Sequence, residues 1–322
     1  MITAFVLHRG RSFWWTLDAG ASIIGVMPTV NEKILDAQIK HSIFLERYKA
    51  GVLKKIVGLL NKSEADLIET IAKRLAGIEE RGFDLGPAST KRLQKLLAEI
   101  VAKREEVYTV LGEQALAELV DFTHYEADFQ VRLTDNAGAN LSLALPSNAQ
   151  LKAIVTAQPF QGRILKDWFD GLAQKDADRV KDAIRIGLTQ NQTVDDMVRR
   201  IRGTKAKKYQ DGILEISRRD AAAVVRTAVS HSAQRARTEV FNANADIVHK
   251  VQYVATLDSR TTLYCATHDG KVYDLGQQPV LPAHWNCRSV YVVYFDGDER
   301  GKRSSAFGPV PDDTDYETFL KG

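Results

Sequence analysis

The segment from Ala255 to Ser289 constrains the fold most, because it contains both cysteines of the 322-residue chain, each three positions from a histidine. The pairs are Cys265 with His268 and His284 with Cys287, and fifteen residues separate the two histidines. Zinc takes four nitrogen or sulfur ligands in a tetrahedron, and a loop that brings these pairs together can supply all four. In a reducing compartment, however, two cysteines are also compatible with free, buried thiols.

The first half of the chain carries the apolar periodicity of long amphipathic helices. Apolar residues recur at spacings of three and four, which predicts one helix over 32–60, with Asn31 as its N-cap, and a second that begins near Ser63. Glycines and a proline predict a loop over 80–89, and a further long helix is expected over 90–133. Helices of this length indicate an elongated hairpin or bundle.

The second half predicts shorter elements. Helices are expected over 163–174, 177–189, 194–202 and 217–244, with Thr193 and Asp196 at the entry to the third of them. The runs VQYVAT, KVYDL and SVYVVYF are rich in β-branched and aromatic residues and predict short strands. The expected fold is therefore mainly α with a small α+β C-terminal domain, in which a short antiparallel sheet carries a Cys/His loop knot, meaning loops joined through those side chains.

Composition shifts suggest four parts of the chain. Residues 1–26 differ in composition from the rest of the chain and precede a second methionine, so we interpret them as a non-essential leader. Their apolar stretch is interrupted by Asp18 and falls short of the ~20 apolar residues of a membrane span, so no membrane partner is expected. An elongated helical domain is expected over 27–145, a second domain over 150–295, and an acidic tail over 296–322.

The net charge of +3 is too small to indicate a partner, but the cations are unevenly distributed. The stretch RRIRGTKAKK contains six cations and no acid. Such a run is either a solvated helix face or a surface that contacts DNA phosphates. The candidate DNA-binding residues are Arg199, Arg200, Arg202, Lys205, Lys207 and Lys208.

The residues around the cysteines form a longer motif. It reads D-x-R-T-T-x-x-C from Asp258, then D-G-K-V-Y from Asp269, then P-x-H-x-x-C-R-S from Pro282. This string resembles the C-terminal motif of the phage head morphogenesis family, minor head proteins similar to protein F of phage Mu. Helical segments before it, such as FQGRILKDWFDGL, are also similar, so the resemblance extends over about 150–295, which makes that stretch a head-morphogenesis-like domain.

The resemblance implies a structural protein of virion assembly. A minor capsid protein of this kind would join the procapsid in the host cytoplasm by binding the portal and other capsid components. It would then stay in the capsid interior, near the packaged double-stranded DNA. DNA binding would be independent of sequence and sensitive to salt.

The resemblance also bears on the candidate site residues. Cys265, His284 and Cys287 fall on motif positions, but the family often has an apolar residue where this chain has His268. A three-ligand zinc site or a loop joined by hydrogen bonds is therefore expected. The remaining motif residues are expected to form a loop clamp, because arginine pairs well with carboxylates. They are Asp258, Arg260, Asp269, Gly270 and Arg288.

Two other functions stay open. In a thiol- or metal-dependent hydrolase, Cys265 would be the nucleophile, His284 the base and Asp258 the orienting group. A free nucleic-acid-binding module is the second alternative. The sequence contains no P-loop, no G-x-G-x-x-G and no H-E-x-x-H motif. Because linking loops explains the same residue types without catalysis, we expect that the protein is not an enzyme.

Overall fold

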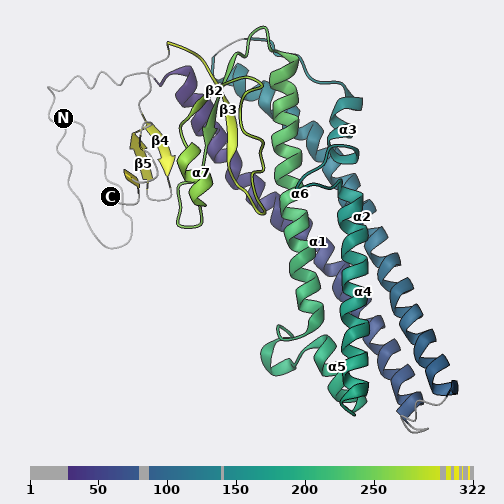
Figure 1. The fold of residues 1–322 in the computed structure, drawn as a ribbon. Helices are drawn as coiled ribbons and strands as arrows, with labels where there is room; N and C mark the ends of the chain where they lie inside the picture. Colours follow the sequence, from purple (N-terminus) through teal and green to yellow (C-terminus); the bar gives the residue numbers. More distant parts are fainter. Residues whose placement is uncertain are drawn as a thin grey trace, which may run out of the picture.

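The computed structural model describes residues 28–79, 87–138 and 141–297, together with 302–305, 308–311, 314 and 318–319. The expected leader, 1–26, and most of the expected loop, 80–89, lie outside these ranges. Helices dominate the fold, and a small antiparallel sheet lies toward the C-terminus, as the sequence predicts (Figure 1). Across these ranges, no helix combines the length and the apolar character that a membrane span requires.

The first helix, α1 (Val30–Glu79), joins the two helices that the sequence predicts. The expected break at Ser63 does not occur, because its hydroxyl bonds to the Leu60 carbonyl within the helix, at 2.8 Å. Asn31 is not the N-cap either. The Thr29 hydroxyl accepts the Glu32 amide at 3.2 Å, and the Glu32 carboxylate accepts the Thr29 amide at 2.8 Å, which is a capping box.

Asn31 instead lies in the first turn of α1 and contacts the end of the sheet. Its side-chain amide donates to the Phe295 carbonyl at 2.8 Å, and its side-chain oxygen accepts the Phe295 amide at 2.9 Å. Asn31, which the sequence predicts as a helix cap, therefore joins the start of α1 to the end of the sheet.

The long helix α2 (Pro87–Asn136) runs antiparallel to α1 (Figure 1). Proline suits its first position because the amide it lacks would have no partner there. The helix ends three residues beyond the predicted end at 133, and Gly138 just after it adopts a φ of +93°. The prediction of one long helix over this stretch is confirmed.

Three helices pack against this pair, and a fourth closes the far end. They are α3 (Asn148–Thr156), α4 (Leu165–Thr189), α5 (Val194–Arg202) and α6 (Ile213–Ala243). The helix α4 continues through the expected interruption near 175, where Asp176 is buried and accepts the Ser217 hydroxyl of α6 at 2.8 Å. The predicted entry of α5 is confirmed, since the Thr193 hydroxyl accepts the Asp196 amide at 3.2 Å.

The predicted sheet is confirmed. Its strands are β1 (Lys250–Val254), β2 (Val272–Asp274) and β3 (Val290–Tyr294), in the antiparallel order β2-β1-β3. The short helix α7 (Leu263–His268) lies between β1 and β2. Within the expected acidic tail, β4 (Lys302–Ser305) and β5 (Gly308–Pro311) pair as a separate two-stranded sheet.

The largest apolar core is common to the helices and the sheet. It includes buried side chains such as Leu111 of α2, Phe169 of α4, Val229 of α6 and Val251 of β1. The predicted domains 27–145 and 150–295 therefore share one core in this structure, and their independence stays a prediction. The sheet and α7 lie at one end of the bundle and α5 lies at the other (Figure 1).

Candidate metal centre and adjoining surfaces

Three of the four predicted ligands meet beside α7. The Cys265 sulfur lies 3.2 Å from Nε2 of His284 and 3.9 Å from the Cys287 sulfur. All three ligand atoms lie within 4.8 Å of one another, and in the part of the chain that the structure describes no other group of this kind is found. Both cysteines are buried. We call these residues the three-ligand cluster.

His268, the fourth predicted ligand, is not part of the cluster. Its Nδ1 lies 2.7 Å from the Tyr264 carbonyl, and its ring stacks on that of Tyr264 with centroids 4.3 Å apart. Of the two predicted Cys/His pairs, the structure brings Cys265, His284 and Cys287 together and leaves His268 outside. One turn of α7 separates His268 from Cys265 and places it beside Tyr264 instead.

Local structure positions each member of the cluster. The Thr262 hydroxyl caps α7 by accepting the Cys265 amide at 3.4 Å, which places Cys265 in the first turn of that helix. The other two members lie on the loop that leads into β3. Helix α6 holds this loop through Ser230, whose hydroxyl donates to the Cys287 carbonyl at 2.9 Å, and through Thr227, whose hydroxyl accepts the Asn286 amide at 3.1 Å.

The electrostatics of the cluster favour one shared negative charge. The hydrogen bond from Cys287 lowers the pKa of the Cys265 thiol, while the same bond and burial raise the pKa of Cys287. The Tyr253 hydroxyl also donates to the Cys265 sulfur, at 3.2 Å. A thiolate is the form of cysteine that binds metals, so these contacts prepare the cluster for a cation.

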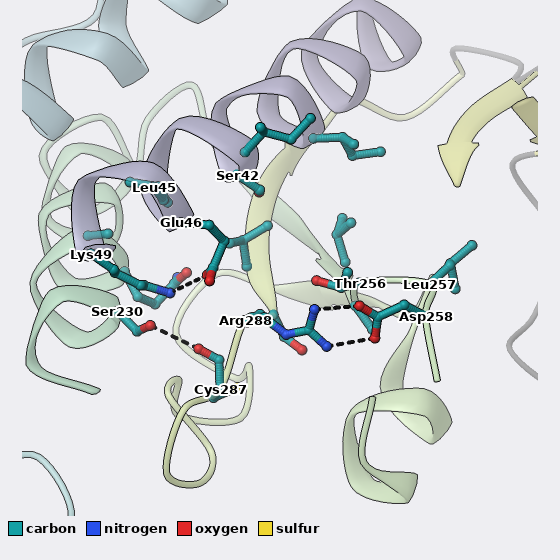
Figure 2. A pocket seen from close by; sticks show the side chains of 18 of the residues that line it. Ser42, Leu45, Glu46, Lys49, Ser230, Thr256, Leu257, Asp258, Cys287 and Arg288 are labelled. Carbon is teal, nitrogen blue, oxygen red and sulfur yellow. Dashed lines mark hydrogen bonds and ion pairs between the residues drawn. The ribbon is translucent and has the colours of Figure 1, made fainter. Parts of the chain in front are cut away.

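The predicted clamp forms around one pair. Arg288 donates to Asp258 from both terminal nitrogens, at 2.6 and 2.7 Å, and these bonds lower the pKa of Asp258 to about 2 (Figure 2). Arg260 lies 3.7 Å from the same carboxylate and is largely exposed. Asp269 instead accepts the Ala255 amide at 2.8 Å, beyond the end of β1.

Gly270 is the last of the predicted clamp residues. It adopts a φ of +77°, which favours glycine, and its amide bonds to the Tyr253 carbonyl at 2.9 Å. Together with Asp269, it therefore fixes the return of the chain from α7 to β2. Only Asp258 and Arg288 form the close charged pair that the sequence predicts.

A cavity of ≈ 330 Å³ lies on the other side of Cys287, between α1, α6 and the ends of β1 and β3. Leu45 and Leu257 line it, and the ion pairs Glu46–Lys49 and Asp258–Arg288 flank it (Figure 2). The sequence does not predict this cavity, because its walls come from segments far apart in the chain.

The predicted DNA-binding residues lie at the far end of the bundle, on α5, on the 3₁₀ turn Lys205–Lys207 and at Lys208 directly after it. The three arginines have neighbours: Arg199 pairs with Asp196 at 3.4 Å, Arg200 donates to Gln190 at 3.1 Å, and Arg202 lies over the Tyr209 ring. The three lysines are exposed and form no ion pair with another described residue. They are Lys205, Lys207 and Lys208.

Comparison with known proteins supports the resemblance seen in the motif. Residues 178–292 match the model of a family described as phage Mu protein F like protein. This range runs from within α4 into β3 and contains α5, α6, the three-ligand cluster and the clamp. Searches of curated proteins and of solved structures gave no match to the chain. Over residues 178–292, the chain is therefore similar to phage Mu protein F like proteins, which supports its resemblance to the phage head morphogenesis family.

Proposed function

We propose that this chain is a minor capsid protein of a tailed double-stranded DNA phage or prophage, which joins the procapsid by binding the portal. The observation that carries the proposal is the family match over 178–292. The matched range includes the Cys/His motif and the clamp, so it covers the residues with the most distinctive chemistry in the chain.

The geometry of the motif supports a structural role over a hydrolase. A Cys–His–Asp hydrolase needs a carboxylate to orient the histidine. Here Asp258 is bound to Arg288, and Nδ1 of His284 lies 2.9 Å from the Trp285 carbonyl. The sulfur of Cys265 is buried against Cys287. These contacts join loops, and none of them exposes a nucleophile.

The long helices suit protein contacts in a capsid. The pair α1 and α2 presents one long surface, on which Ile43 and Phe44 of α1 and Tyr125 of α2 are exposed. Phe44 and Tyr125 also contact each other, with ring centroids 5.3 Å apart. Exposed aromatic side chains of this kind are enriched where proteins bind one another. We assign the portal contact to this surface of the bundle.

The experiment is co-purification from cells in which the phage is induced. A tagged chain should appear in purified procapsids and virions, and it should bind the portal protein in a pull-down. Replacement of Phe44 and Tyr125 by Ser should weaken that binding, while replacement of the exposed Lys33 and Lys40, on the same helix, should leave it unchanged. Absence of the chain from both procapsids and virions would refute the proposal.

A further inference from the structure

Two of the three separations in the three-ligand cluster are close to those of a tetrahedral zinc site, and the third is below 4.8 Å. With Zn–S near 2.3 Å and Zn–N near 2.0–2.1 Å, two sulfurs lie ~3.8 Å apart and each sulfur lies ~3.5 Å from a nitrogen. The observed distances are 3.9 Å between the Cys265 and Cys287 sulfurs and 3.2 Å between the Cys265 sulfur and Nε2 of His284. Small shifts of side chains are enough to admit one ion.

The imidazole of His284 is already oriented as a ligand. Its Nδ1 lies 2.9 Å from the Trp285 carbonyl, and a carbonyl only accepts hydrogen bonds, so Nδ1 carries the proton. Nε2 is therefore unprotonated and has a lone pair available for a metal, 3.2 Å from the Cys265 sulfur. Zinc-binding histidines have this arrangement, in which the second ring nitrogen donates to a carbonyl or carboxylate.

The cluster also has room for a fourth ligand of the size of one water molecule. A hollow of ≈ 20 Å³ borders Cys265, His284 and Thr262. One water needs about 10–15 Å³, so the hollow is large enough for a single water. The Thr262 hydroxyl lies 3.0 Å from Nε2 of His284, where it can bond to a ligand in this position.

We infer that the three-ligand cluster binds one zinc ion and that a water molecule held by Thr262 is its fourth ligand. The ion joins α7 to the loop before β3, which α6 already holds through Ser230. It binds both buried sulfurs as thiolates and offsets their charge. Its role is to hold α7 and the loop before β3 together, and His268 is not a ligand.

The test uses the full chain, purified without chelators. Elemental analysis should find close to one zinc per chain. Cobalt(II) added to the chelator-stripped protein should give the intense visible bands of tetrahedral coordination and the thiolate charge-transfer band. His284→Gln should lose both the bound zinc and the cobalt spectrum, whereas the matched control His268→Gln should keep both. Thr262→Val should keep the site but weaken cobalt affinity about 10–100-fold, as other outer-shell changes do.

Three outcomes would overturn the inference. They are folded wild-type protein with neither zinc nor a cobalt spectrum, equal loss of metal in His268→Gln and His284→Gln, and unchanged cobalt affinity in Thr262→Val. If His284→Gln fails to fold, the cobalt titration of the wild-type chain still decides whether the site exists. Because these measurements detect the metal directly, their result is independent of whether the protein enters a capsid.

Discussion

Arg288 holds Asp258 by two parallel hydrogen bonds, at 2.6 and 2.7 Å, and so joins the loop before β3 to the turn after β1. Arg288 directly follows Cys287 of the three-ligand cluster. The clamp and the cluster therefore connect two neighbouring segments, the turn after β1 and the first turn of α7, to the same loop before β3. Both side chains of the clamp are largely shielded from solvent, with 17% and 23% of their surfaces exposed.

Loss of the clamp should destabilise the protein. Asp258→Asn removes the charge that receives both bonds, and hydrogen bonds to charged groups contribute about 1.5–3 kcal/mol. We expect the free energy of unfolding, measured by denaturant titration, to fall by that amount. Arg260→Gln is the control, because its side chain is 77% exposed and lies 3.7 Å from Asp258. It should change stability by less than about 0.5 kcal/mol, and an equal loss in both variants would contradict the role of the Arg288 pair.

The clamp also predicts a dependence of stability on pH. Arg288 lowers the pKa of Asp258 to about 2 in the folded protein, compared with about 3.9 in an unfolded chain. A lowered carboxyl pKa stabilises the fold above the unfolded value, and this contribution is lost as the pH falls from about 4 to 2. The difference in stability between the wild-type protein and Asp258→Asn should therefore shrink over that interval. A difference that stays constant down to pH 2 would mean that the carboxylate charge is not responsible.

A second charged pair lies within the helical bundle. Asp176 of α4 accepts bonds from Arg104 of α2, from the Tyr108 hydroxyl at 3.1 Å and from the Ser217 hydroxyl of α6 at 2.8 Å. Arg104 and Asp176 are each 1% exposed. Removal of one partner leaves a buried charge without compensation, which costs about 3–5 kcal/mol.

Asp176→Asn should therefore lower the free energy of unfolding by about 3–5 kcal/mol. Thermal or denaturant unfolding measures this loss. The matched control is Asp66→Asn, which breaks the Lys103–Asp66 pair between α1 and α2. Asp66 is 66% exposed, so its loss should cost no more than about 1 kcal/mol. Similar losses in the two variants would show that burial does not set the energy of these pairs.

The sequence predicts elements whose cause is local. The strands, the Thr193 cap of α5 and the end of α2 near Gly138 all follow from residue types next to one another, and all are confirmed. Two predicted helix breaks are wrong. Ser63 bonds within its own helix, and Asp176 is satisfied by Arg104 and Ser217. From the sequence alone, a polar residue that forms its hydrogen bonds inside the fold cannot be distinguished from a polar residue at a helix boundary.

The candidate site shows the same limit. Each cysteine has a histidine three positions away, so spacing alone treats His268 and His284 alike, and only the resemblance to the head morphogenesis motif favours His284. The structure separates them, because His268 lies beside Tyr264 and His284 is turned toward Cys265. Which histidine meets the sulfurs depends on how the loop before β3 packs on α6, and the sequence contains no local signal for that packing.

The shared core bears on the predicted domains. Leu111 of α2 and Phe169 of α4 belong to one apolar cluster, although they fall in different predicted units. Residues 150–295 expressed alone would expose the surface that α1 and α2 cover, so we expect a fragment that aggregates or binds a hydrophobic dye. Addition of residues 27–145 as a second chain should restore solubility. A soluble, monomeric 150–295 fragment with cooperative unfolding would instead support independent domains.

The exposed lysines at the far end of the bundle allow a test of DNA contact. If Lys205, Lys207 and Lys208 meet phosphates, their replacement by Gln should reduce the slope of log affinity against log salt by about 2.7, at ~0.9 per contact. Binding of duplex DNA at several salt concentrations, measured by fluorescence anisotropy, gives this slope. The control replaces three exposed cations of α1, which are Lys33, Arg47 and Lys54. Equal changes in the two triple variants would mean that only net charge matters.

A variant that keeps every charge tests whether the shape of this turn matters. Gly212 lies against the chain at Arg202, and a Cβ there would be 2.4 Å from backbone atoms. Gly212→Ala should therefore displace the turn that Thr204 and Asp211 close through bonds of 2.8 and 2.9 Å. If the turn presents the lysines to phosphates in a fixed arrangement, this variant should weaken DNA binding at constant net charge, with circular dichroism confirming that the bundle is intact. Binding equal to wild type in an intact Gly212→Ala protein would mean that the basic stretch 199–208 is an ordinary solvated surface.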